Sequence, residues 1–103
     1  MSITFHPLKV KNIRRETADC ISVSFDVPES VSSDFNFKQG QYLTFKKDID
    51  GNEVRRSYSI CSSPLEGELR VAIKQVEEGL FSTFVNNELK VGDILDTMTP
   101  QGL

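Results

Sequence analysis

Alternating apolar and polar residues recur along the chain, which is the pattern of half-buried β-strands. The clearest run covers residues 21–27, where every second residue is apolar, and Pro28 follows as a residue that cannot donate to a strand ladder. Further strands are predicted over about 5–15, 41–47, 53–62, 69–76 and 94–98. The connections are short, so an antiparallel sheet curled into a barrel is the simplest all-β arrangement.

One segment has helical spacing instead of alternation. Its apolar residues stand at positions 81, 84, 85 and 89, on one side of a helix of two to three turns, although Asn86 and Asn87 weaken the pattern. Asp50 and Gly51 form the centre of a tight turn that joins two predicted strands into a hairpin. A loop is predicted over 28–38 and a turn over 64–67.

Composition narrows the possible functions. The 103 residues fit one small domain, and the net charge of −3, with its acidic excess after residue 60, does not resemble a nucleic-acid binder. Two cysteines and one histidine are too few for a disulfide framework, a four-thiolate iron–sulfur cluster or a structural zinc site. No apolar run is long enough to span a membrane and no signal peptide is visible, so a cytoplasmic location is the expectation. Redox chemistry would therefore need a bound organic cofactor or another domain.

The first candidate site lies in the second strand of the predicted hairpin. Strand alternation places Arg56 and Tyr58 on one face and the Ser59 side chain on the other. A guanidinium beside an aromatic ring suits a ligand that is anionic at one end and flat at the other. Ser59 reaches such a ligand through its backbone N–H or through a local twist. A surface arginine next to a strand tyrosine, without any ligand, stays open as the alternative.

The second candidate site is the start of the predicted helix. Free N–H groups and the helix dipole favour phosphate there, Gly79 allows close approach, and Ser82 and Thr83 offer hydroxyl donors. Ordinary helix capping is the competing explanation.

Taken together, these motifs resemble the flavin-binding domain of the ferredoxin–NADP reductase superfamily. The resemblance rests on Arg-Ser-Tyr-Ser at 56–59, Gly-Gln-Tyr at 40–42, Gly-Leu-Phe-Ser at 79–82 and Pro-Gln-Gly at 100–102, in matching order over essentially the whole chain. Within the superfamily, the chain is most similar to the reductase components of phenylacetyl-CoA ring-oxygenase (epoxidase) systems. The resemblance implies a six-stranded antiparallel Greek-key barrel with one short capping helix that binds FAD.

The resemblance also implies roles for individual residues. Arg56 would bind the pyrophosphate, with Ser57 beside it in the motif. Tyr58 would pack against the isoalloxazine ring and Ser59 would hydrogen-bond near N5, so these two are the expected catalytic residues. The remaining expected cofactor contacts are the backbone around Ile73 and Lys74 at the pyrimidine edge, and Gly79, Leu80, Phe81 and Ser82 around the phosphates.

In the whole enzyme, the resemblance implies that the flavin takes hydride from NAD(P)H and passes electrons to a [2Fe–2S] centre and an oxygenase component, in phenylacetate degradation. Residues 1–103 would be the FAD-binding domain alone, inactive without the NAD-binding and [2Fe–2S] domains, with 100–103 leading into the missing part. No nucleic acid or membrane partner is expected. Two alternatives stay open: an FMN-binding reductase domain, and a β-barrel interaction module without flavin.

Overall fold

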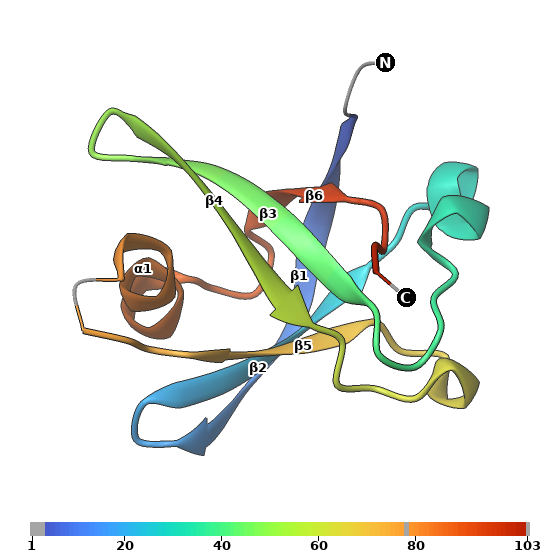
Figure 1. Cartoon of the computed structure of the whole chain (residues 1–103), viewed down its shortest axis with the longest axis horizontal. Helices are drawn as coiled ribbons and strands as arrows, with labels where there is room; N and C mark the ends of the chain where they lie inside the picture. The colour runs from blue at the N-terminus through green and yellow to red at the C-terminus, as the bar shows by residue number, and fades with distance from the viewer. Residues whose placement is uncertain (1–3, 78, 103) are drawn as a thin grey trace.

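The computed structural model describes residues 4–77 and 79–102, and over them six strands form one antiparallel sheet (Figure 1). The strands are β1 (Phe5–Thr17), β2 (Cys20–Asp26), β3 (Tyr42–Ile49), β4 (Asn52–Ser59), β5 (Arg70–Lys74) and β6 (Ile94–Met98). Their order in the sheet is β4-β3-β6-β1-β2-β5, so β6 inserts between β3 and β1. This confirms the predicted six-stranded antiparallel fold and its non-sequential Greek-key connections.

The barrel closes only loosely, because β4 and β5 are the two edges of the sheet. They meet at an isolated bridge between Ile60 and Val71, where the Cys61 N–H donates to the Arg70 carbonyl at 2.8 Å. Beyond this bridge the strands diverge, and helix α1 (Leu80–Glu88) lies in the opening between β5 and the β3–β4 hairpin (Figure 1). We call this opening the seam, and α1 is the capping helix that the apolar spacing predicts.

The interior of the barrel is apolar, as the alternation predicts. Its largest fully buried apolar side chains are Leu8, Val10, Ile21, Val23, Leu43, Phe45, Val71, Ile73, Phe81, Val85 and Leu95. The expectation of a half-buried strand is wrong for β2, because Ser22 and Ser24 on its polar face are 2% and 1% exposed. The Arg70 side chain crosses that face and donates from Nη1 to Ser22 Oγ at 2.7 Å.

The connections contain more regular structure than the sequence predicts. The loop expected over 28–38 contains a 3₁₀ helix, η1 (Glu29–Phe35), and the turn over 64–67 contains another, η2 (Pro64–Glu66), with a capping box between Ser63 and Glu66. The hairpin turn is as predicted, with Asp50 and Gly51 at φ +52° and +82°. In the described part of the chain, no helix is long and apolar enough to cross a membrane.

The segment expected to lead out of the barrel is held against it over residues 101–102. Gln101 and Tyr42 exchange two backbone hydrogen bonds of 3.0 Å, and the Gly102 carbonyl accepts from Gln41 Nε2 at 3.2 Å. Gly102 adopts φ +95° against the Tyr42 ring, where an added Cβ would come within 2.9 Å of a ring carbon. This explains the glycine at that position.

Candidate functional site

Arg56 and Tyr58 lie on the face of β4 that is turned toward α1. Their partners on β3 are Phe45 and Leu43, both fully buried, which confirms that the two side chains share one face as the alternation predicts. Arg56 is nevertheless exposed, and within the described residues its guanidinium donates only from Nη1 to the Arg55 carbonyl, at 2.7 Å. Among the same residues it forms no ion pair. A cation without a carboxylate partner is available to an anionic ligand.

Tyr58 joins the two candidate sites of the sequence. Its ring stacks on Phe81 of α1 with a centroid distance of 5.8 Å, and both rings pack against Phe45, at 6.3 and 5.8 Å. Burial raises the pKa of the Tyr58 phenol, and the nearby Arg56 charge acts in the opposite direction. The β4 motif and the start of the helix are thus held together by an aromatic cluster.

The backbone of Ser57 and Ser59 faces the seam. The Ile60 N–H donates to the Gln41 carbonyl at 3.0 Å, so the backbone groups of Ile60 and Tyr58 point toward β3. By the alternation of the ladder, those of Ser57 and Ser59 point to the open edge. The Ser57 hydroxyl lies 2.7 Å from Thr44 Oγ1 on the opposite face. A ligand in the seam therefore meets the Ser59 N–H, which is the backbone route that its position in the strand predicts.

The two β5 residues whose backbone is expected to contact a ligand, Ile73 and Lys74, point their backbone groups in opposite directions. The Gln75 N–H donates to Asp19 at 2.6 Å, whereas the Arg70 carbonyl accepts from β4, so alternation turns the Lys74 backbone toward the seam. The Ile73 side chain is fully buried, and its carbonyl accepts from Asn86 Nδ2 at 3.2 Å. The Ile73 side chain is thus part of the core, and its carbonyl bonds to α1.

The helix start offers backbone groups rather than side chains. Phe81 is fully buried and Ser82 is 3% exposed, with the Ser82 hydroxyl accepting from the Val76 N–H at 3.1 Å. The first-turn N–H groups of α1 have no acceptor within the helix, no side chain caps them, and no acidic residue lies in that turn. The backbone N–H groups of Leu80, Phe81 and Ser82 are therefore the groups that this helix start presents, whereas the Ser82 hydroxyl bonds to Val76 and Gly79.

Gly79 is required by packing and not by an unusual backbone angle. Its φ is −79°, but an added Cβ would lie 2.5 Å from Val76 Cγ2 and 2.6 Å from Ser82 Oγ. The absence of a side chain lets the first turn of α1 close onto the end of β5.

Asn86 fixes the position of α1, although the sequence marks it as a weak point of the helix. It is 6% exposed, and its Nδ2 donates to the carbonyls of Ile73 and Ser82 at 3.2 and 2.9 Å. Arg15 of β1 donates to Asn86 Oδ1 at 3.0 Å and to its carbonyl at 2.8 Å. One side chain therefore ties the helix to β5 and to the β1–β2 hairpin. Helical periodicity carries no signal for such a contact.

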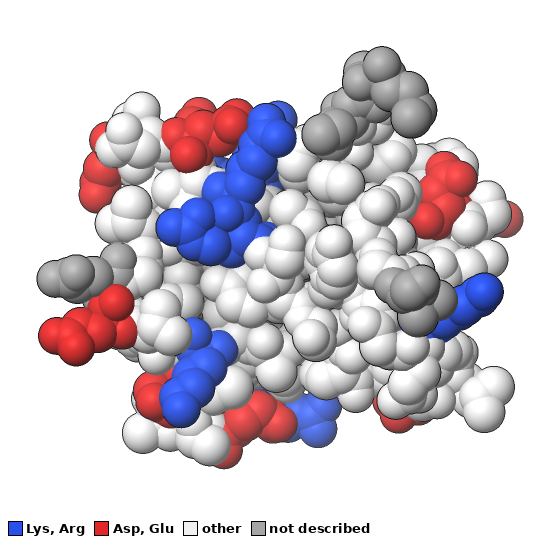
Figure 2. Space-filling model, in the orientation of Figure 1, with Lys and Arg blue, Asp and Glu red and all other residues white. Residues whose placement is uncertain are grey.

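The surface of the β3–β4 hairpin carries charges of both signs. Figure 2 shows Lys and Arg side chains gathered over the hairpin, with Asp and Glu side chains beside them on one side and a broad uncharged area on the other. An exposed arginine, an aromatic ring, strand-edge N–H groups and an uncapped helix start fit an elongated ligand with a flat end and phosphates. FAD has both features. No cluster of three His, Cys, Asp or Glu side chains occurs within residues 4–77 and 79–102.

Comparison with known proteins agrees with this chemistry. Residues 7–103 match the model of the oxidoreductase FAD-binding domain family. The chain belongs to this family. The match confirms that this domain is of an FAD-binding type, as the resemblance in the sequence implied.

Individual relatives cover the same region. The FAD-binding domain is 43% identical over 99 residues to one of the subunits of the 1,2-phenylacetyl-CoA epoxidase of Escherichia coli K12, aligning 96% of this chain with 28% of that protein. It is 32% identical over 98 residues to the ferredoxin reductase component of the 3-ketosteroid-9-alpha-monooxygenase of Rhodococcus rhodochrous, aligning 93% of this chain with 28% of that protein. The chain thus spans about a quarter of the length of these relatives.

The fold recurs in a ferredoxin NADP⁺ reductase of Neisseria gonorrhoeae whose crystal structure holds FAD and NADP. The TM-score is 0.80 at 19% identity, over 99% of this chain and 40% of that one. At this identity the likeness concerns the fold.

Proposed function

We propose that this domain is the flavin module of an NAD(P)H-dependent electron-transfer oxidoreductase and that it holds FAD along the seam. Arg56 binds the pyrophosphate together with the N–H groups of Leu80, Phe81 and Ser82, and Gly79 allows their close approach. Tyr58 packs against the isoalloxazine, the Ser59 N–H faces N5, and the Lys74 backbone faces the pyrimidine edge. FAD, when bound, supplies hydride acceptance and onward electron transfer, which no side chain of this chain provides.

The observation that carries this proposal is the environment of Arg56. Its guanidinium has no ion pair in the described structure and shares the α1-facing side of β4 with Tyr58. The Tyr58 ring centroid lies 5.8 Å from that of Phe81, which stands in the first turn of a helix without a side-chain cap. Three groups that favour a phosphate-linked aromatic ligand therefore converge from two distant parts of the chain.

The wider activity is a proposal drawn from relatives. The E. coli relative is part of an epoxidase and the Rhodococcus relative is a monooxygenase reductase component. We therefore assign an oxygenase component as the electron acceptor, reached through a [2Fe–2S] centre, in the cytoplasm and in phenylacetate degradation. NADH or NADPH oxidation requires parts of the protein beyond these 103 residues.

The test is a titration of the purified chain with FAD, followed by visible absorption and flavin fluorescence. Saturable binding with a perturbed flavin band supports the proposal. A folded chain that does not perturb FAD at any concentration contradicts it and favours the interaction module without flavin.

A further inference from the structure

Helix α1 has few features of its own that keep it ordered. It contains nine residues, and isolated helices shorter than about 12 residues are marginal in water. No side chain caps its first turn, and its last turn contains no basic residue that would interact with the helix dipole. The position of α1 therefore depends on contacts with other parts of the fold.

Arg15 of β1 supplies the cation that the last turn of α1 lacks. The β1–β2 hairpin ends on the same side of the molecule as α1 (Figure 1). The Arg15 guanidinium donates from Nη2 to the Asn86 carbonyl at 2.8 Å and from Nη1 to Asn86 Oδ1 at 3.0 Å. Its other acceptor among the described residues is the Ala18 carbonyl, at 3.5 Å, and no carboxylate of those residues forms an ion pair with it. Arg15 thus bonds to a helix end whose carbonyls have no donors within the helix.

Asn86 connects this contact to the first turn of the helix. Its Nδ2 donates to the Ser82 carbonyl in the first turn at 2.9 Å and to the Ile73 carbonyl on β5 at 3.2 Å. Because a guanidinium only donates and carbonyls only accept, these partners fix the orientation of the Asn86 amide. Asn86 is 6% exposed, so without Arg15 its Oδ1 would lose a donor where little water can replace it.

We propose that Arg15 is a positioning residue for the phosphates of the flavin and that it acts through Asn86 on the first turn of α1. This inference rests on the proposed function, in which the first-turn N–H groups bind the phosphates. Arg15 itself touches no ligand, because it bonds to the opposite end of the helix. The isoalloxazine contacts proposed above come from β4 and β5. Loss of Arg15 therefore affects phosphate binding and leaves the contacts of the flavin ring in place.

The experiment compares the dissociation constants of FAD and of riboflavin, which has the isoalloxazine ring but no phosphate, for wild type and Arg15→Met. Arg15→Met should weaken FAD binding about three- to tenfold and leave riboflavin binding unchanged. Arg15→Lys keeps a cation at the helix end and should recover part of the loss. Arg14→Met is the matched control, because Arg14 is the neighbouring exposed arginine and its ion pair is with Glu16, at 3.7 Å. It should change neither affinity.

Amide hydrogen exchange of the flavin-free chain gives a second readout that does not depend on a ligand. Arg15→Met should speed the exchange of residues 84–88 in α1 more than that of residues 21–25 in β2. A merely structural role would instead speed both segments equally.

The outcomes separate the positioning role from the proposed function. The positioning role is overturned if Arg15→Met leaves FAD affinity unchanged, weakens FAD and riboflavin equally, or does not speed exchange in α1 selectively. Each of these results leaves flavin binding by the wild type intact. Failure of the wild type to bind FAD would instead contradict the proposed function.

Discussion

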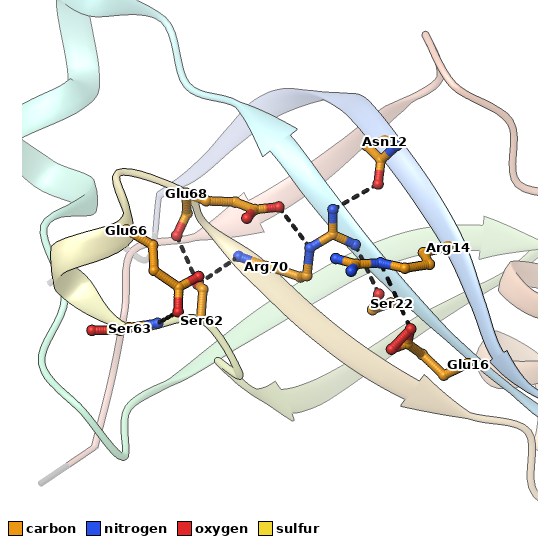
Figure 3. Close-up of polar contacts among 9 residues, drawn as sticks. All are labelled: Asn12, Arg14, Glu16, Ser22, Ser62, Ser63, Glu66, Glu68 and Arg70. Carbon is orange, nitrogen blue, oxygen red and sulfur yellow. Dashed lines mark hydrogen bonds and ion pairs between the residues drawn. The ribbon is translucent and has the colours of Figure 1, made fainter.

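Two arginines on the edge strands of the sheet have opposite environments. Arg70 on β5 is 7% exposed, and its guanidinium donates to Glu68 at 2.6 Å, Ser22 at 2.7 Å and Asn12 at 2.6 Å (Figure 3). Arg56 on β4 is exposed and reaches only a neighbouring carbonyl. The first arginine has a complete set of protein partners, whereas the second has none for its charge among the described residues.

The difference separates a structural cation from a binding one. Arg70 links β1, β2 and β5 beside the bridge that closes the barrel, so its partners stabilise the fold. Arg56 lies where the same two edges have diverged, and no carboxylate of the described chain pairs with its charge. Arg56 can therefore form charge-assisted hydrogen bonds with a ligand, whereas Arg70 already forms them within the fold.

The largest expected effect comes from Arg70→Met. This change leaves Glu68 without its cation and Ser22 and Asn12 without their donor, so the free energy of unfolding should fall by about 3 kcal/mol. Urea denaturation followed by circular dichroism measures it, and the FAD affinity of the remaining folded chain should stay within about threefold.

The matched control is Arg14→Met, because the Arg14–Glu16 pair is exposed and 3.7 Å long. It should change the free energy of unfolding by less than about 0.5 kcal/mol. If Arg70→Met and Arg14→Met lower the free energy of unfolding equally, the structural role of Arg70 is contradicted.

A smaller effect is expected from Gly79→Ala. The new Cβ displaces the Ser82 hydroxyl and breaks its hydrogen bond from the Val76 N–H, so the free energy of unfolding should fall by about 1–2 kcal/mol. Ser82→Ala removes the obstructing oxygen. The double variant should therefore lose less stability than the sum of the two single variants, and strict additivity would contradict the steric account.

The smallest effect concerns alkaline pH. Because burial raises the pKa of Tyr58 above 10.0, its phenol supports folding below that value and the support is lost as the pH rises through the folded-state pKa. Phenolate absorbance of Tyr42→Phe, which retains Tyr58 as the one tyrosine, should show this late titration. Adding Arg56→Ala should raise the pKa further, since the Arg56 charge lowers it, and adding Arg55→Ala should not. A lowered value with Arg56→Ala would contradict the proposed proximity.

Local patterns predict most of the fold. Alternation locates the six strands, Asp50-Gly51 locates the hairpin turn, and the apolar spacing from 81 to 89 locates α1. These signals are local, because strand pleat and helix pitch are repeated within a few residues. The loosely closed barrel is not visible in them, since it depends on how α1 packs between two edges.

The candidate site is only partly predictable for the same reason. Arg56 and Tyr58 can be recognised as neighbours on one strand face, and their roles toward FAD stay predictions. Asn86 and Arg70 cannot be recognised in this way, because their partners lie 71 residues away at Arg15 and 58 residues away at Asn12. The orientation of the Ser82 hydroxyl is not predictable from sequence either, because it is set by a hydrogen bond from the Val76 N–H.

The most direct test of the binding role of Arg56 is the FAD dissociation constant of Arg56→Ala beside that of wild type and of Arg55→Ala. Arg55 is the matched control, since it is paired with Glu53 at 3.1 Å and lies on the other face of β4. We expect a ten- to hundredfold weaker FAD complex for Arg56→Ala, equivalent to about 1.5–3 kcal/mol, with unchanged unfolding and unchanged affinity for Arg55→Ala. An Arg56→Ala chain that binds FAD as tightly as wild type would contradict this role.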